Sequence, residues 1–206
     1  MKDDSVTRDE ADLVRRCARG DGAAYRELVG RLEKPLLTFI QKYVGEPNLA
    51  EDLFQETFVR VVRSLGDFRP DASITTWIFT IARNLCLDHL KAKRRHREVS
   101  IDAGSGGEGG NVIDFREALR TLGPGPGAQS EAREQEAKLR RAIGELGGPK
   151  REALILRAFS GLSYQEIARI TEAPVGTVKF RVHEAVQELA RKLAPAAGKD
   201  QTGTGS

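Results

Sequence analysis

Five side chains near the C-terminus share one face of a helix that the sequence predicts over residues 175–193. They are Lys179, Phe180, His183, Glu184 and Gln187. Side chains of these types can donate to guanine, contact a thymine methyl group or accept from cytosine, which is how proteins read base edges in the major groove of DNA. The opposite face is an apolar stripe at helical spacing, predicted to be buried: Val178, Val182, Ala185, Val186, Leu189 and Leu193.

A second, shorter helix is predicted just before this one. Ser163 and Glu166 form a capping-box pattern, and the turn Glu172-Ala173-Pro174 separates the two helices. A short capped helix, a tight turn and a longer helix make up the helix-turn-helix arrangement. An ordinary helical hairpin with a polar outer face fits the periodicity equally well.

A dense basic cluster closes a long helix predicted from Ile74 to about Arg95. Residues 91–97 read Lys-Ala-Lys-Arg-Arg-His-Arg, which suits contact with nucleic-acid phosphates. The alternative is a solvated basic helix end, which the helix dipole favours. The side predicted to face a core carries Trp77, Ile78, Ile81, Ala82 and Leu85. The opposite side carries Thr76, Thr80, Arg83, Leu87, Lys91 and Arg94.

An acidic, hydrogen-bonding patch lies on another helix, predicted from a capping-box pattern at Asn48 and Glu51 to about Ser64. The patch consists of Asp52, Gln55 and Glu56. The predicted core face of this helix carries Leu53, Phe54, Phe58, Val61, Val62 and Leu65. An acidic patch does not suit DNA phosphates and fits a basic protein partner. A merely solvated face is the alternative.

The rest of the 206-residue sequence favours an all-α protein of two small helical domains. Charged residues make up 31% but the net charge is only +3, which excludes a uniformly basic DNA-binding protein. No alternating strand pattern is visible. Thr7 and Glu10 predict the start of a first helix that stops at Gly20, Asp21 can cap a second, and Pro35 starts a third.

A Gly- and Pro-rich stretch over residues 99–129 predicts a flexible linker, because it cannot bury enough apolar surface to offset its ordering entropy. The predicted domains are therefore 1–98 and 130–194, followed by a disordered tail over 195–206. Within the linker, the stretch 112–122 could dock as a helical turn on a partner. The linker also matches GxGxxG at Gly104, Gly106 and Gly109, but no strand precedes it, so we reject dinucleotide binding.

The sequence offers no pattern for catalysis, a metal or a cofactor. Walker, HExxH and GxSxG motifs are absent, and His183-Glu184 lacks the second His of a zinc protease. Cys86, His89 and His96 lack the paired spacing of zinc ligands. We therefore expect no enzyme activity, no metal and no cofactor. Because neither a secretory signal nor a membrane-spanning run is visible, we expect the protein in the cytoplasm.

Several runs resemble bacterial sigma factors of the sigma-70 superfamily. The runs AEDLFQETF (50–58), FRPDAS (68–73) and TWIFTIARN (76–84), followed by Asp88, are similar to their polymerase-binding and promoter-melting segment. The runs GLSYQEIA (161–168) and PVGTVK (174–179) are similar to their promoter-reading helix-turn-helix. Their order and spacing resemble the extracytoplasmic-function (ECF) group, and the resemblance covers about residues 10–98 and 134–194.

The resemblance implies a transcription initiation factor that binds core RNA polymerase, recognises the −10 and −35 promoter elements and assists melting. It implies that Asp52, Gln55 and Glu56 bind the clamp of the polymerase's largest subunit. It assigns the −10 element to Phe68, Arg69, Ser73, Trp77, Arg83, Asn84, Lys91, Arg94 and Arg95. It assigns the −35 element to Thr177, Lys179, Phe180, Arg181, His183, Glu184 and Gln187. An anti-sigma factor is the expected inhibitory partner, and the linker is expected to thread near the polymerase active site.

Three positions depart from the family pattern. Similar proteins often have a small residue at the position of Phe180, a basic one at Glu184 and Gly at Glu172. These departures bear on which −35 sequence is read and not on the acidic patch. A stand-alone helix-turn-helix regulator is the runner-up hypothesis, and it leaves the N-terminal half without a task.

Overall fold

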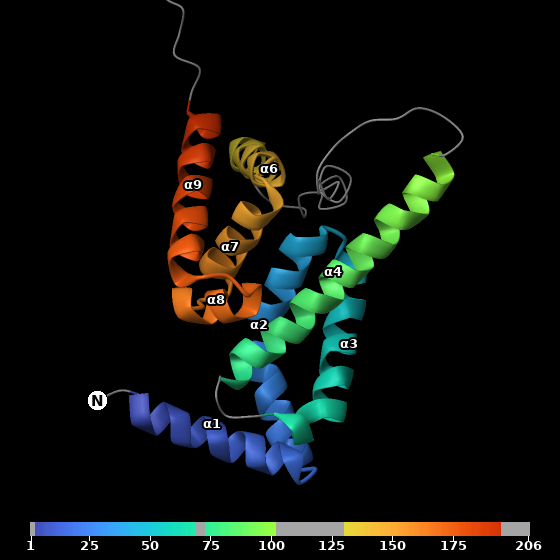
Figure 1. Cartoon of the computed structure of the whole chain (residues 1–206), viewed down its shortest axis with the longest axis vertical. Coiled ribbons are helices and arrows are strands. Elements are labelled where there is room, and N and C mark those ends of the chain that lie inside the picture. Colours follow the sequence, from blue (N-terminus) through green and yellow to red (C-terminus); the bar gives the residue numbers. More distant parts are fainter. Residues whose placement is uncertain (1–2, 69–72, 102–129, 195–206) are drawn as a thin grey trace, which may run out of the picture.

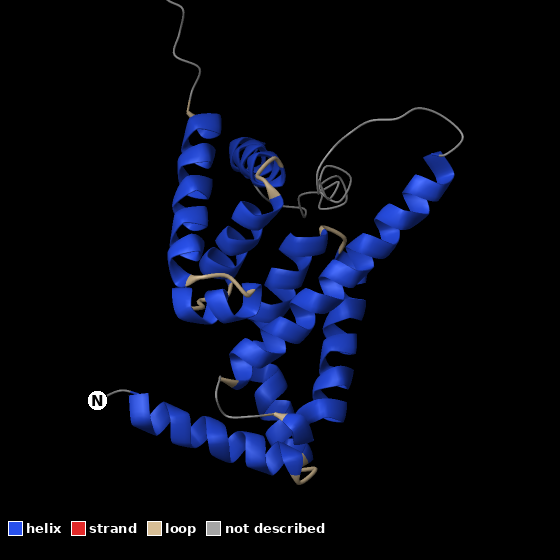
Figure 2. Ribbon diagram, in the orientation of Figure 1, coloured by secondary structure: helices blue, strands red, loops and turns tan. Residues whose placement is uncertain are grey.

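Helices form every regular element of the described chain. The computed structural model describes residues 3–68, 73–101 and 130–194, and these ranges contain no strand (Figures 1 and 2). The helices are α1 (Asp3–Ala18), α2 (Gly22–Val44), α3 (Pro47–Ser64), the 3₁₀ turn η1 (Leu65–Asp67), α4 (Ile74–Ile101), α6 (Ser130–Gly144), α7 (Gly148–Phe159), α8 (Tyr164–Thr171) and α9 (Val175–Leu193). The predicted all-α class is confirmed. Arg69, linker residues 102–129 and the predicted tail lie outside the described residues.

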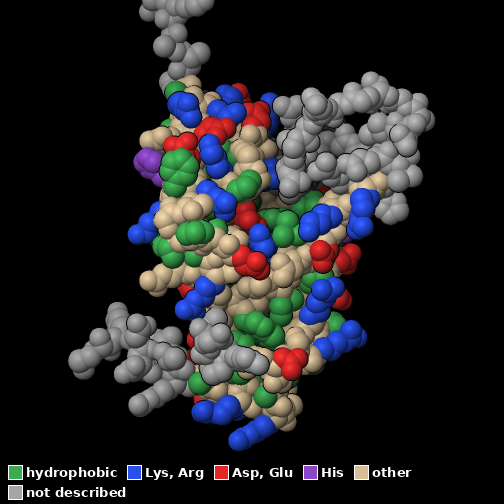
Figure 3. Space-filling view, in the orientation of Figure 1, with side chains coloured by type: hydrophobic (Ala, Val, Ile, Leu, Met, Phe, Trp, Pro, Cys, Tyr) green, Lys and Arg blue, Asp and Glu red, His purple; other side chains and the backbone are tan. Residues whose placement is uncertain are grey.

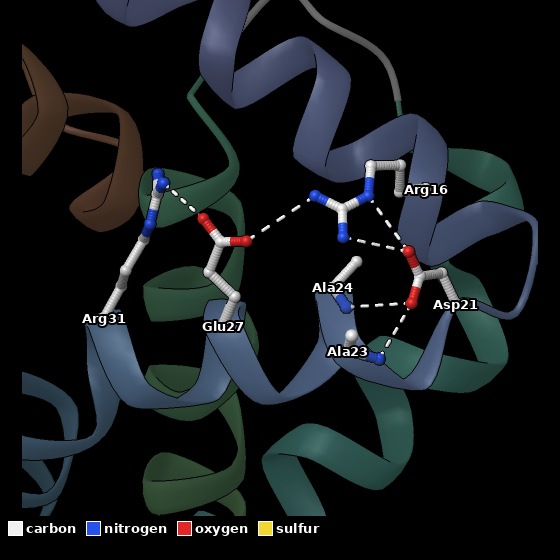
Figure 4. A network of polar contacts seen from close by, with 6 residues as sticks. All are labelled: Arg16, Asp21, Ala23, Ala24, Glu27 and Arg31. Atoms are coloured by element: carbon white, nitrogen blue, oxygen red, sulfur yellow. Dashed lines mark hydrogen bonds and ion pairs between the residues drawn. The ribbon is translucent and has the colours of Figure 1, made fainter.

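Asp21 builds the corner between α1 and α2. Its carboxylate accepts from the backbone N–H groups of Ala23 at 2.8 Å and Ala24 at 3.2 Å, and from Arg16 Nε at 3.0 Å (Figure 4). The bond from Ala24 and then the one from Arg16 hold the pKa of Asp21 below its ordinary value. Gly20, with φ at +81°, adopts the left-handed conformation that lets the chain turn here. The predicted cap of the second helix is confirmed.

The predicted helix start at Pro35 is wrong, because α2 runs unbroken from Gly22 to Val44. A proline inside a helix costs about 3 kcal/mol through the lost hydrogen bond and ring clash. Leu28, Leu32 and Leu36 continue on one buried face across the proline. Each buried leucine contributes about 1.5–3 kcal/mol, so burial along this face outweighs the local cost.

Two predicted capping boxes are also wrong. Helix α1 begins at Asp3, upstream of Thr7, and α3 begins at Pro47 without a side-chain cap, one residue before Asn48. Proline suits the first helical position because it has no N–H group to leave unpaired. Glu10 does not cap its own helix: its Oε1 accepts from the backbone N–H of Ile74 at 2.6 Å, so α1 caps the start of α4.

Helix α4 is the long diagonal helix of Figure 1, and its C-terminal end projects from the body of the molecule. It continues to Ile101, past the predicted end at Arg95 and into the range predicted for the linker. Ile78 and Phe79 are fully buried, but so is Thr76, which was predicted on the opposite side. The reason is that α8 packs against α4, so both α3 and α8 cover this helix.

The helix-turn-helix is formed by α8 and α9, with the predicted turn and bounds. The Ser163 hydroxyl accepts from Glu166 N at 3.2 Å and the Glu166 carboxylate accepts from Ser163 N at 2.8 Å, which confirms this capping box. Val178, Val182 and Ala185 bury the inner face of α9. Two members of the predicted stripe are instead exposed, Val186 and Leu193, because they lie at the edge of the face that α6 and α7 cover.

The two domains share one hydrophobic core. A single cluster of buried side chains includes Phe39 and Ile40 of α2, Phe79 of α4, and Ile155 of α7 and Ile167 of α8. Helix α2 packs on α7 and α4 packs on α8. The helix-turn-helix is therefore held against the N-terminal helices in this structure.

Candidate nucleic-acid interface

The outer face of α9 presents the predicted base-reading side chains to solvent. Phe180 is 62% exposed, and Lys179, His183 and Gln187 are exposed as well. Gln187 Nε2 lies 2.9 Å from His183 Nε2, and Lys179 Nζ lies 5.9 Å from the ring centroid of Tyr164. An exposed phenyl ring among polar groups on a helix of this kind is free to meet a thymine methyl group.

Glu184 differs from the other predicted base-reading residues. It is half-buried, and Lys150 Nζ of α7 lies 3.6 Å from its carboxylate. Glu184 therefore lies on the side of α9 that faces α7, at the edge of the exposed face around Phe180. Thr177 and Arg181 are also half-buried. Lys150 Nζ also lies 3.4 Å from the carboxylate of Glu188, so one lysine faces two carboxylates and offsets the charge of Glu184 only in part.

A stripe of aromatic, amide and basic side chains runs along one face of α4. Trp77, Asn84, Lys91 and Arg95 follow at intervals of seven, seven and four residues, which is the repeat of one helix face. At 1.5 Å per residue the stripe spans roughly 27 Å. The Phe68 ring lies 5.4 Å from that of Trp77, edge to face, at one end of the stripe. Asn84, Lys91 and Arg95 are exposed. The side chain of Arg94 lies outside the described part of the chain.

Arg83 faces the second domain instead of joining this stripe. Its Nε donates to Glu152 Oε1 of α7 at 2.8 Å, with the two side chains 16% and 10% exposed. The Tyr43 hydroxyl donates to the same oxygen at 2.9 Å. Burial opposes the charged form of Arg83, but the hydrogen bond and charge of Glu152 raise its pKa above the ordinary value. Burial and the neighbouring Glu152 carboxylate likewise raise the pKa of Tyr43.

Ser73 caps α4 and also contacts the second domain. Its hydroxyl accepts from Thr76 N at 3.1 Å, so it is the N-cap of the helix. The same hydroxyl donates to Glu166 Oε1 at 3.3 Å, which ties the start of α4 to the start of α8.

The predicted acidic patch lies on the solvent side of α3. Asp52 and Gln55 are exposed, and Glu56 is partly exposed and paired with Arg60 at 3.0 Å. Val62 was predicted in the core but is 54% exposed, because α2 and α4 cover only the face that carries Leu53, Thr57 and Val61. The patch therefore adjoins an apolar strip made of Val59 and Val62 at the C-terminal half of α3.

Charges of both signs are mixed on the face of the molecule that Figure 3 draws. Lys and Arg side chains are spread over this face, with Asp and Glu among them. In the described residues no cluster of metal-ligating side chains occurs. The same residues include no helix that is long and apolar enough to cross a membrane. Cys86 is fully buried, which raises the pKa of its thiol.

The sequence did not predict the contacts that three polar residues make between helices. These residues are Tyr43, Glu152 and Glu10, which caps α4. The only signal for Glu152 is its charge at the head of the apolar run that follows it in α7. Nothing in the sequence identifies its partner Arg83, which is 69 residues away.

An exposed reading face on a helix-turn-helix, packed on a second helical domain with an aromatic and basic stripe, defines a two-domain DNA-binding protein. Residues 28–96 match the family model of sigma-70 region 2, and residues 136–189 match that of sigma-70, region 4. The chain belongs to the sigma-70 family and, within it, to the ECF group of sigma factors. It is therefore a promoter-specific transcription initiation factor that works with RNA polymerase, in a family of non-enzymatic transcription factors.

Similar proteins extend over most of the chain. RNA polymerase sigma-H factor of Pseudomonas aeruginosa is 34% identical over 187 residues, covering 90% of this chain and 94% of that protein. ECF RNA polymerase sigma-E factor of Escherichia coli is 33% identical, covering 89% and 93%. Among solved structures, Bartonella quintana sigma factor RpoE, in complex with the anti-sigma factor NepR, has a TM-score of 0.61 and 25% identity, with 82% and 96% covered. CnrH, in complex with the cytosolic domain of CnrY, shares the fold with a TM-score of 0.63 at 23% identity, with 89% and 96% covered.

Proposed function

We propose that this protein binds core RNA polymerase through α3, captures the −10 element along α4 and reads the −35 element with α9. The observation that carries the proposal is a pair of faces made of side chains suited to DNA. The one on α9 is exposed, and the one on α4 has Asn84, Lys91 and Arg95 exposed and Trp77 half-buried. The proposed unit boundaries are 1–98 and 130–194, with the linker predicted over 99–129, of which residues 99–101 belong to α4 in this structure.

Helix α3 carries the proposed contact with the polymerase clamp. Asp52, Gln55 and Glu56 offer two negative charges and an amide, which complement a basic protein surface. The exposed Val59 and Val62 beside them supply apolar area of the kind that is buried in protein–protein interfaces. The combination favours a protein partner over a nucleic acid on this face.

The α4 stripe carries the proposed −10 contact and melting step. Once the strands separate, the Phe68 and Trp77 rings can stack on bases, and base stacking is worth about 1–3 kcal/mol per base. Asn84 can hydrogen-bond a captured base, and Lys91 and Arg95 can hold the adjoining phosphates. We propose the same site for Arg69, Ser73, Arg83 and Arg94, with Arg83 paired to Glu152 of α7 in this structure.

Helix α9 carries the proposed −35 contact. Lys179, Phe180 and His183 lie in the N-terminal half of α9, which is the part of a recognition helix that usually meets base edges. Gln187 extends the same face, and Thr177 and Arg181 flank it. Glu184 is proposed for the same contact and lies at the edge of this face that is next to Lys150.

The remaining properties follow from this role. The polymerase supplies the chemistry, so the protein itself turns over no substrate and needs no cofactor. We propose that it acts in the cytoplasm, where RNA polymerase is found. A sigma factor of similar fold forms a complex with an anti-sigma factor, and a separate inhibitor of that kind is proposed for this chain as well.

Charge reversal on α3 tests the polymerase contact. Asp52→Lys combined with Glu56→Lys should lower affinity for core polymerase at least about tenfold, because like charges would then oppose each other. Helicity measured by circular dichroism should not change, since both side chains reach solvent. Glu33→Lys, a single charge reversal at an exposed site on α2, is the control and should bind normally. Unchanged affinity of the double variant contradicts the assignment.

A further inference from the structure

Lys150 lies beside the exposed face of α9 around Phe180, its reading face, but on a different helix. It belongs to the first turn of α7, which begins at Gly148, and its ammonium group reaches across to α9. There Nζ lies 3.6 Å from Glu184 Oε2 and 3.4 Å from Glu188 Oε2. A lysine outside the proposed recognition helix therefore contacts two acidic side chains within it.

Glu184 shares its side of α9 with Phe180. Residues four apart on a helix are neighbours, so the carboxylate would face the same stretch of major groove as the phenyl ring. A carboxylate there can accept from the exocyclic amine of cytosine. It also opposes the negative phosphates along the groove. An acidic residue at this place therefore reads a base better when a cation lies close by.

We infer that Lys150 is a positioning residue for −35 recognition. It holds Glu184 at the edge of the reading face, so that α9 selects cytosine at one position of the element. The ion pair uses Oε2 of Glu184, which leaves Oε1 to accept from the base. The inference rests on the proposed function, because it takes α9 as the helix that reads the −35 element.

Two effects of Lys150 favour this role. A side chain that is already held in one rotamer loses less conformational entropy when it meets a base. The ammonium group also offsets part of the repulsion between Glu184 and the phosphates, although it is shared with Glu188. Loss of the lysine should therefore weaken cytosine selection. Loss of the charge on Glu188 should strengthen it, because Glu184 would then have the lysine to itself.

The test is transcription with core RNA polymerase from a promoter library with a randomised −35 element, read by sequencing the transcripts. Glu184→Ala identifies the position at which cytosine selection depends on this carboxylate. At that position Lys150→Met, which keeps the apolar stem, should lower the selection about two- to fivefold, the range that a partly exposed ion pair supplies. Lys150→Arg should retain the selection, and Glu188→Gln should raise it about twofold. A fall in selection with Glu188→Gln overturns the inference.

Combining Lys150→Met with Glu184→Ala separates positioning from direct contact with DNA. If the lysine acts through Glu184, the double variant selects the same −35 sequences as Glu184→Ala alone. If Lys150→Met instead weakens all −35 sequences alike, with or without Glu184, the lysine binds a phosphate by itself and the inference is overturned. Lys192→Met removes another lysine contact of α9, at 2.6 Å from Glu145, and is the matched control that should leave selection unchanged.

Failure of this inference and failure of the proposed function give different results. A Glu184→Ala protein that keeps every wild-type base preference overturns the inference, because Glu184 then reads no base for Lys150 to position. A wild-type protein that supports no transcription from any member of the library contradicts the proposed function instead. Helicity by circular dichroism should be the same in all variants, since none of the substituted side chains is buried.

Discussion

Phe180 should set the preferred −35 sequence of this protein. A phenyl side chain offers about 150–250 Å² of surface, so 62% exposure leaves roughly 90–150 Å² to be buried on DNA. Burying half of that area at about 25 cal/mol per Å² contributes about 1–2 kcal/mol, a factor of roughly 5–30 in preference. Phe180→Ser should therefore change which −35 sequence is preferred. Protein stability should shift by less than about 0.5 kcal/mol, because the ring is not in the core.

The assay is transcription from a promoter library with a randomised −35 element, read by sequencing the transcripts of each variant. Val186→Ser removes another exposed apolar side chain of α9, outside the predicted reading face, and should leave the preferred sequence unchanged. Arg181→Ala should weaken all promoters alike and lower the salt dependence of binding, as loss of a phosphate contact does. If Phe180→Ser keeps the wild-type preference while Arg181→Ala shifts it, the reading face of α9 has been assigned to the wrong side.

Three further changes test other parts of the structure. Asn84→Ala should reduce open-complex formation more than closed-complex binding, seen as weaker permanganate reactivity of promoter thymines; wild-type reactivity in a normally folded variant contradicts base capture by this exposed side chain. Glu172 has φ at 52°, a left-handed conformation that is strained for a side chain, so Glu172→Gly should raise the free energy of unfolding by about 1 kcal/mol while Glu172→Ala does not; a lower melting temperature of the glycine variant refutes this. Folding lowers the pKa of Asp21, so its contribution to stability is present above its unfolded pKa of about 3.9 and is lost as pH falls through the folded value. Asp21→Asn keeps the N-cap acceptor without titrating, so urea unfolding over a pH series should show a weaker loss of stability in acid, and an unchanged pH profile contradicts a lowered pKa of Asp21 in the folded protein.

Local signals predicted the helix-turn-helix well. The Ser163 and Glu166 capping box, the turn over residues 172–174 and the bounds of α9 depend on residues next to one another in sequence. The exposed Phe180 also followed from helical periodicity alone. Such features are set by hydrogen bonds within one turn of helix, which sequence patterns record directly.

Long-range packing was the part that sequence patterns could not supply. Pro35 favours a helix start locally, yet the buried face across it keeps α2 continuous. Thr76 and Arg83 looked solvent-exposed because the contact of α4 with α7 and α8 joins segments far apart in the chain. Glu10 fits an N-terminal cap by spacing and instead caps α4. Each of these outcomes depends on which helix covers which face, and no spacing rule within a single helix contains that information.

Transcription with purified core RNA polymerase tests the central claim most directly. Genomic DNA fragments would be transcribed with and without this protein, and the 5′ ends of the transcripts mapped by sequencing. We expect new start sites that require the protein and share one pair of −10 and −35 sequences. We expect them to disappear with Asp52→Lys combined with Glu56→Lys and to persist with Glu33→Lys. A folded protein that adds no start sites, but binds duplex DNA specifically without polymerase, would contradict the account.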